Sequence, residues 1–298
     1  MVSRSAAHTG VVVGVDSSAA SHGAVRWAAH EAALHNLPLA LVYAMPTEGF
    51  SAVEFVFAAP SAHLQQQEDE AHRVITAAVG VAEEATGASG PEITTEIRRG
   101  AAVPTLVDLS RDARLVVVGS HGQGAFGRTL LGSVSTGLVH HAHCPVAVIR
   151  ESASPTAPSD TLPVVVGVDG SPASELATEI AFDEASRRGA DLIALHAWSD
   201  STIFPLPTAQ WSDLRTQADA VLAERLAGFC ERYPDVGVSR QLVQEHPARH
   251  LCDRSESAQL VVVGSRGRGG FTGMVLGSVS SAVVHGAHAP VIVARRRD

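Results

Sequence analysis

The sequence contains no lysine, since all 22 basic residues of the 298-residue chain are arginine. This absence excludes a pyridoxal Schiff base, the lysine of a Walker-type phosphate loop and the strand lysine of a protein kinase. Any bound nucleotide is therefore expected to be held by backbone groups, hydroxyls and arginine side chains.

Cysteine, basic patches and long apolar runs are also scarce. Three scattered cysteines are too few for a disulfide framework or a zinc site, which favours a reducing cytosol. The formal net charge is −9, whereas nucleic-acid binding usually needs a basic face. No segment approaches the length of a membrane-spanning helix, and no N-terminal stretch has the composition of a signal peptide. We therefore expect a cytoplasmic protein that binds neither nucleic acid nor membrane.

An internal duplication organises the chain. Residues 11–46 align without gaps onto residues 164–199 with 15 of 36 positions identical, and residues 115–149 align onto residues 260–294 with 21 of 35 identical. Such self-similarity indicates two copies of one domain. Residues 151–162 are rich in serine, proline and threonine and predict a linker. The expected domains are residues 1–150 and 163–298.

Short apolar runs alternate with helical segments in each half, which indicates parallel strands joined by right-handed crossovers. In such α/β sheets, ligands bind at the carboxyl ends of the strands, where the winding reverses. We expect strands at residues 10–15, 39–44, 93–98, 115–119 and 146–150, and near residues 164–168, 192–197, 238–243, 260–264 and 291–294, with helices between them.

A glycine-rich loop follows the fourth strand of each half, with the pattern Gly-x2-Gly-x9-Gly-Ser starting at Gly119 and Gly264. Glycine lets backbone N–H groups approach an anion, and the helix that follows offers its positive end. We interpret both loops as phosphate-binding, the alternative being tight loops that need glycine for backbone geometry alone. Residues 122–127 also match the dinucleotide pattern Gly-x-Gly-x-x-Gly, but they follow the fourth strand and Thr272 breaks the pattern in the repeat.

Polar residues flank these loops. Asp16 and Asp169 each end a buried strand, either as turn or cap residues or as ligands that reach phosphate through Mg²⁺ or order the phosphate loop. His121 and Arg266 occupy equivalent loop positions, which would make the two sites unequal. The serines that open the next helix are expected to cap it and to donate to phosphate oxygens. They are Ser133, Ser135, Ser278 and Ser280.

These motifs resemble the universal stress protein family, and more narrowly its tandem-domain, ATP-binding members from actinobacteria. The resemblance implies an α/β fold of two tandem Rossmann-like (adenine nucleotide alpha hydrolase-like) domains. Each would hold a five-stranded parallel sheet of order 3-2-1-4-5 with helices on both faces. It also implies ATP between the loop after the first strand and the glycine loop, Mg²⁺ near Asp16 and Asp169, and assembly as a homodimer.

The resemblance assigns the binding residues by position, with the backbone of Ala44 and Ala197 meeting adenine. Tyr43 stands where the second half has His196, which departs from the family pattern on the adenine side. The first site would comprise Gly14, Val15, Asp16, Ala44, Gly119, His121, Gly122, Gly132, Ser133, Val134 and Ser135. The second would comprise Gly167, Val168, Asp169, Ala197, Gly264, Arg266, Gly267, Gly277, Ser278, Val279 and Ser280.

The resemblance implies a nucleotide-dependent regulator of growth or survival under stress, acting through conformation or choice of protein partner. The sequence has no Gly-x-Ser-x-Gly elbow, no His-Glu-x-x-His motif and no obvious nucleophile paired with a base, so it is not expected to be an efficient enzyme. A slow ATPase or nucleotidyl transferase is the first alternative, and a scaffold that binds no nucleotide is the second.

Overall fold

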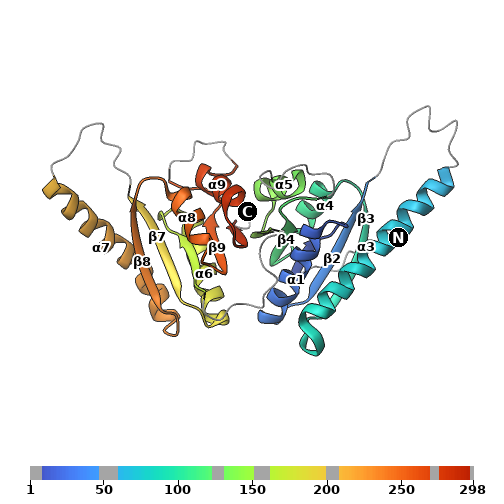
Figure 1. Cartoon of the computed structure of the whole chain (residues 1–298), viewed down its shortest axis with the longest axis horizontal. Helices are drawn as coiled ribbons and strands as arrows, with labels where there is room; N and C mark the ends of the chain where they lie inside the picture. The colour runs from blue at the N-terminus through green and yellow to red at the C-terminus, as the bar shows by residue number, and fades with distance from the viewer. Residues whose placement is uncertain are drawn as a thin grey trace. The chain divides into compact units, whose positions relative to one another are not determined.

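The computed structural model describes residues 9–46, 60–122, 131–150, 162–198, 208–268 and 275–295, with the side chains of residues 60–63 and 208–212 left out (Figure 1). The chain divides into two compact units between Pro155 and Thr156. The predicted linker lies outside the described residues except for Leu162. We call the two units the first and second halves and describe each by itself.

Strands and helices alternate along the first half in the order that was predicted. Its elements are β1 (Val11–Gly14), α1 (Ala19–Leu34), β2 (Leu39–Met45), α3 (Pro60–Thr86), the short 3-10 helix η1 (Gly87–Ser89), β3 (Ile93–Arg99), α4 (Ala102–Leu109), β4 (Leu115–Gly119), α5 (Ser133–His141) and β5 (Val146–Ile149).

The second half repeats this succession without the 3-10 helix. Its elements are β6 (Val164–Gly167), α6 (Pro172–Arg188), β7 (Leu192–Trp198), α7 (Thr208–Arg232), β8 (Val238–Gln244), α8 (Pro247–Ser255), β9 (Leu260–Gly264), α9 (Ser278–Gly286) and β10 (Val291–Ala294).

All strand pairs within each half are parallel, so the predicted α/β class with two parallel sheets is confirmed. In the first half, β1 pairs with β2 and β4, β2 pairs with β3, and β4 pairs with β5, which gives the order β3-β2-β1-β4-β5. The equivalent pairs in the second half give β8-β7-β6-β9-β10. The winding therefore reverses between β1 and β4, and between β6 and β9.

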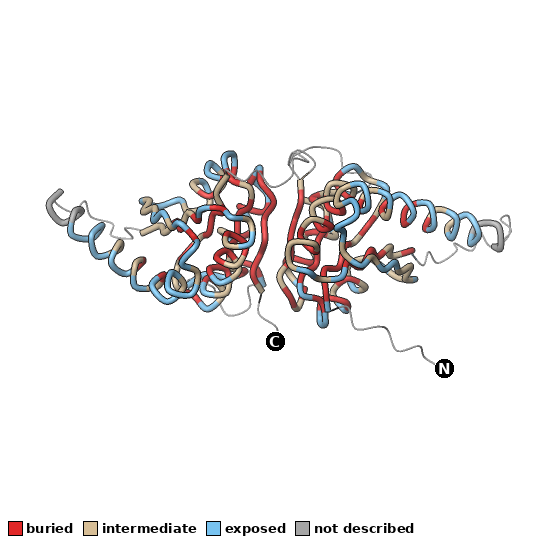
Figure 2. Tube along the Cα trace, turned by 90° about the horizontal axis from the view of Figure 1, so that it is seen from below, coloured by how far each residue is buried: buried red, intermediate tan, exposed pale blue. Residues whose placement is uncertain are grey.

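This reversal places helices on both faces of each sheet. Right-handed crossovers carry α1 and α3 over one face as the chain moves from β1 to β3, and α4 and α5 over the other as it returns to β4 and β5. Accordingly α1 packs on α3, and α4 packs on α5. Strands covered on both faces need apolar side chains throughout, as in the Val-Val-Val runs of β1 and β4. Figure 2 shows these strands buried and the long helices α3 and α7 largely exposed.

Among the described residues, no helix combines the length and the apolar composition that crossing a bilayer requires.

Candidate functional site

Each half has a cavity where the carboxyl ends of its first and fourth strands meet. The first cavity has a volume of about 490 Å³ and the second about 400 Å³, both within the range of small-molecule sites. Every residue assigned to the two sites from the sequence lines the cavity of its own half. The structure therefore brings the two sets together, as the strand order requires.

An aspartate connects two loops around the first cavity. The Asp16 carboxylate accepts hydrogen bonds from the Ser18 backbone N–H at 2.9 Å and from its hydroxyl at 2.5 Å. The same hydroxyl lies 3.4 Å from the His121 carbonyl oxygen in the glycine loop. A Cβ atom on Gly122 would lie 2.6 Å from Asp16 Oδ2, so glycine is needed for the carboxylate to sit against this loop.

The second cavity repeats this arrangement. Asp169 Oδ1 accepts the Ser171 N–H at 2.8 Å, and the Ser171 hydroxyl donates to the Arg266 carbonyl oxygen at 3.0 Å. Asp169 Oδ2 accepts the Arg268 N–H at 3.1 Å, and a Cβ atom on Gly267 would lie 2.6 Å from it. The bonds to Ser18 and Ser171 are those of turn aspartates, and the bond from Arg268 also ties Asp169 to the glycine loop.

The first glycine of each loop serves helix packing. A Cβ atom on Gly119 would lie 2.8 Å from the carbonyl carbon of Ala20 in α1, and one on Gly264 would lie 2.7 Å from that of Ala173 in α6. Backbone atoms cannot move away as a flexible side chain can. Glycine at these two positions is therefore explained by the fold alone.

The helix after each glycine loop begins without a side-chain cap. Gly132 is the N-cap of α5 and Gly277 that of α9, and neither helix has a side-chain capping hydrogen bond. The buried Ser135 hydroxyl donates instead to the carbonyl oxygens of Ser120 and Gly132, and Ser280 does the same with Ser265 and Gly277. The expectation that the serines at residues 133, 135, 278 and 280 cap the helix was wrong, because Gly132 and Gly277 occupy the N-cap positions and neither helix has a side-chain capping hydrogen bond.

The helix after the first strand differs in this respect. Ser18 caps α1 by accepting the Ser21 N–H at 3.1 Å, and Ser171 caps α6 by accepting the Ser174 N–H at 3.2 Å. In α5 and α9, by contrast, the described residues provide no acceptor for the N–H groups of the first three helical residues. Those residues are Ser133, Val134 and Ser135, and Ser278, Val279 and Ser280, and all six line a cavity.

The apolar side of each cavity lies where β2 extends beyond the end of β1, and β7 beyond the end of β6. β1 pairs with β2 only as far as Val42, whose carbonyl oxygen accepts the Val15 N–H at 2.9 Å. Alternate residues of a parallel strand direct their backbone groups to the same neighbour, so the backbone of Ala44 faces the space beyond the end of β1. The Val168 N–H bonds Leu195 in the same way at 2.8 Å, which leaves Ala197 in the equivalent place.

Several lining residues were not predicted from the sequence. The Ser21 and Ser174 hydroxyls accept the backbone N–H groups of the two aspartates, and Leu106 and Leu251 form part of the apolar wall. Each pair occupies equivalent positions of the repeat and is identical in both copies. The identity of these residues in the two copies could have marked them as candidate site residues.

Tyr43 and His196, which occupy equivalent positions of the repeat, are placed differently in the two halves. Tyr43 lines the first cavity, and burial raises the pKa of its hydroxyl, with Glu70 and Asp16 adding to the shift. The ring of His196 instead bonds the Val168 carbonyl oxygen through Nδ1 at 2.6 Å. Tyr43 therefore lines the first cavity, whereas His196 is not among the residues that line the second.

A guanidinium group approaches the loop after β6. Gly170 has a φ of +76°, and a Cβ atom there would lie 1.8 Å from Arg225 Nη1. This Nη1 atom is buried and has no hydrogen-bond partner in the described part of the chain. The first half has Ser17 at the position of Gly170.

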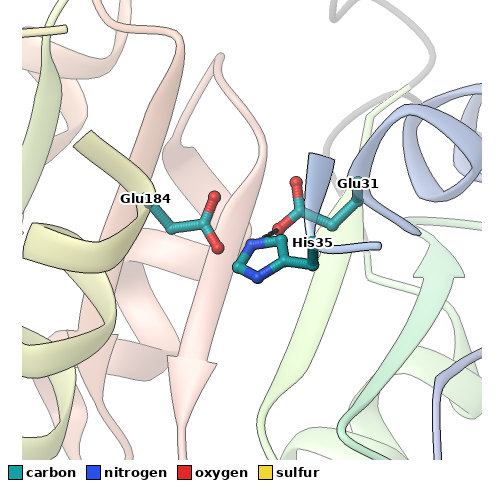
Figure 3. A group of neighbouring side chains, drawn as sticks. All are labelled: Glu31, His35 and Glu184. Carbon is teal, nitrogen blue, oxygen red and sulfur yellow. Dashed lines mark ion pairs between the residues drawn. The ribbon is translucent and has the colours of Figure 1, made fainter. Parts of the chain in front are cut away.

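A histidine-for-arginine difference also occurs away from the cavities. Glu31 Oε1 lies 3.2 Å from His35 Nε2 in α1, and Figure 3 draws this buried pair. At the equivalent positions of α6, the buried Glu184 carboxylate, drawn in the same figure, lies 3.0 Å from the Arg188 guanidinium. Each pair is an (i, i+4) contact within its own helix.

Comparisons with known proteins agree with this architecture. The model of the Universal stress protein family matches residues 9–150 and 162–295. A universal stress protein of Mycobacterium tuberculosis is 52% identical over 287 residues, which cover 96% of each chain. Another from Mycolicibacterium smegmatis is 49% identical over 295 residues, or 99% of each chain. The crystal structure of a universal stress protein from Archaeoglobus fulgidus has the same fold, with a TM-score of 0.69 and 21% identity over 97% of this chain and 99% of that one.

Proposed function

The chain belongs to the universal stress protein family, and we propose that it is an ATP-binding regulator with one nucleotide site in each half. Binding would control its conformation or its choice of protein partner, and the output would be growth or survival under stress. We further propose that it acts in the cytoplasm as a homodimer.

The observation that carries the proposal is the contrast between helix caps. α1 and α6 receive a serine side chain at their N-termini, whereas the described residues offer no acceptor to the first three N–H groups of α5 and α9, whose residues line a cavity. The N-terminus of a helix attracts anions through these groups and through its dipole. A phosphate group is a suitable acceptor, and the glycines at residues 122, 132, 267 and 277 line the same cavities.

The apolar side supports the choice of an adenine nucleotide. The aliphatic wall that includes Leu106, or Leu251, offers a flat base an apolar surface. The backbone N–H and C=O of Ala44 and Ala197, beyond the ends of β1 and β6, are suited to the hydrogen-bonding edge of adenine. The phosphates would then lie toward α5 and α9.

The aspartates fit a limited role toward Mg²⁺. The oxygens of Asp16 and Asp169 already accept loop donors, yet a carboxylate oxygen has a second lone pair. Mg²⁺ that accompanies ATP needs only one or two protein carboxylates. When bound, the ion would offset phosphate charge, and the aspartates would chiefly keep the glycine loops in place.

The first test identifies the nucleotide. Freshly purified protein is denatured, and the released nucleotides are identified and quantified by mass spectrometry. We expect two ATP molecules per chain. Recovery of ADP alone would favour the slow ATPase, whereas recovery of no nucleotide, with no binding on titration with ATP and Mg²⁺, would leave the scaffold.

A matched pair of substitutions tests the helix N-termini. Ser133 and Ser278 are exposed at the first helical position, where an acidic side chain stabilises a helix. S133D/S278D should therefore preserve the thermal stability of the nucleotide-free protein while repelling phosphate, so nucleotide recovery should fall at least tenfold. S133N/S278N, which is neutral and of similar size, should retain the nucleotide. Equal recovery from the two double variants would contradict the proposed phosphate position.

A further inference from the structure

The two cavities differ in fixed charge. In the described part of the chain, the ionic side chains that line the first cavity are Asp16 and His121, and no arginine lines it. The second cavity is lined by Asp169, Arg266 and Arg268. At neutral pH, with histidine uncharged, the formal sum is −1 in the first cavity and +1 in the second.

The arginines of the second cavity are available to a ligand. Arg266 and Arg268 contact their own half through backbone atoms, as acceptor from Ser171 and as donor to Asp169. Neither guanidinium has a hydrogen bond or ion pair with another described residue, and both side chains are exposed. An always-charged fork of donors is the side chain best suited to a phosphate oxygen.

The corresponding side chain in the first cavity is already engaged. His121 Nδ1 lies 2.5 Å from the Ser120 hydroxyl, so one ring nitrogen is occupied within the loop. The residue equivalent to Arg268 is Gln123, which is uncharged and lies outside the described residues. Among the described residues, the first cavity therefore offers backbone N–H groups where the second adds guanidinium groups.

Arg225 adds a third positive charge beside the second cavity. Its guanidinium lies against Gly170, the residue after the cavity-lining Asp169, and its buried Nη1 lacks an acceptor among the described residues. Its position reinforces the positive potential at the loop after β6.

From these contacts we infer that the second cavity selects nucleotides by the number of their phosphate charges, whereas the first cavity discriminates little between a triphosphate and a monophosphate. The inference rests on the proposed nucleotide binding and names a specificity that differs between the halves. Under this assignment Arg266 and Arg268 are the residues that determine specificity. The first cavity accepts AMP nearly as well as ATP, and the second favours ATP.

The test measures the ratio of the Kd for AMP to the Kd for ATP in each cavity of the full chain by calorimetry. S133D is expected to block nucleotide binding in the first cavity, so that binding to the second is measured alone. S278D is expected to block the second cavity, so that binding to the first is measured alone. Each exposed arginine should add about two- to fivefold in preference for the more charged ligand, the range of a solvent-exposed ion pair. The ratio should thus be about four- to 25-fold larger in the second cavity.

Loop substitutions then assign the difference to the arginines. In the S133D background, R266H/R268Q should lower the ratio to that of the first cavity. In the S278D background, H121R should raise the ratio in the first cavity. This variant still tests the inference if R266H/R268Q fails to fold. R249Q removes an arginine that is 79% exposed and lies outside the cavity, and should leave the ratio unchanged.

The outcomes separate the two proposals. Equal ratios in the two cavities, or ratios that R266H/R268Q and H121R leave unchanged, would overturn the inference while ATP binding stands. Absence of both ATP and AMP binding in all variants would overturn the proposed function and this inference with it.

Discussion

The glycine loop of the first half presents His121 to its cavity, whereas the loop of the second half presents Arg266 and Arg268 at the same place. Around these side chains the two backbones agree. Each half has an aspartate bound to a serine N–H, a glycine against that aspartate, and a helix without a side-chain cap. The duplicated chain thus retains the geometry that positions donors and differs in the charges added to it.

The largest expected effect tests whether the shared geometry is equally demanding in both halves. G119A places a Cβ atom within 3 Å of the backbone of α1, and G264A places one within 3 Å of the backbone of α6. We expect each to lower the free energy of unfolding by about 1–3 kcal/mol, measured by denaturant titration. The controls are G80A and G228A, which lie in helices with open space around them and should stabilise by about 0.5–1 kcal/mol. Unequal losses for G119A and G264A would show that the two helix contacts are not equivalent.

A smaller loss in the free energy of unfolding is expected at Gly170, against which the Arg225 guanidinium lies in the second half. G170A combines a positive φ with a collision against the Arg225 guanidinium, and we expect a loss of about 1–2 kcal/mol. G189A provides the control, because its φ is +61° and nothing lies within 4 Å of its Cβ position. If G170A costs no more than G189A, the guanidinium moves aside freely. Adding R225A to G170A should recover the part that is due to the collision.

The smallest effect concerns Tyr43, which lines the first cavity where the second half has His196. Its pKa is raised above the ordinary value of 10.0, first by burial and then by Glu70 and Asp16. The neutral hydroxyl therefore contributes stability that is present below the ordinary value and is lost as pH rises through the raised one. The chain has two tyrosines, so the absorbance difference between wild type and Y43F isolates this titration.

Substitutions at the two aspartates provide the controls for this titration. D16N should lower the Tyr43 pKa, because it removes a nearby negative charge, and D169N in the other half should leave it unchanged. Saturating ATP should raise it further if phosphate charge enters the first cavity. A Tyr43 titration that responds equally to D16N and D169N would contradict the assigned cause.

The sequence was sufficient for the fold class and for part of the lining of each cavity. Buried Val-Val-Val strands followed by glycine or aspartate mark the carboxyl ends of parallel strands, and their repetition excludes chance. The sequence was insufficient where a side chain has two possible hydrogen-bond partners. Ser135 and Ser280 are of a residue type that often caps helices, but their hydroxyls donate hydrogen bonds to the carbonyl oxygens of Ser120 and Ser265, 15 residues earlier. The approach of Arg225 to Gly170 joins residues 55 positions apart (225 minus 170), and no local pattern encodes it.

The uncapped helices also bear on how the protein would respond to its surroundings. A helix whose missing acceptor is supplied by a ligand is more stable when that ligand is abundant. At a free concentration one hundred times the Kd, a ligand that binds only the folded state adds about 2.7 kcal/mol to the free energy of unfolding. The melting temperature of each half would then follow the nucleotide level of its solution. If both proposals hold, a cell that exhausts its ATP would loosen the start of α9 first, whereas AMP would still occupy the first cavity beside α5.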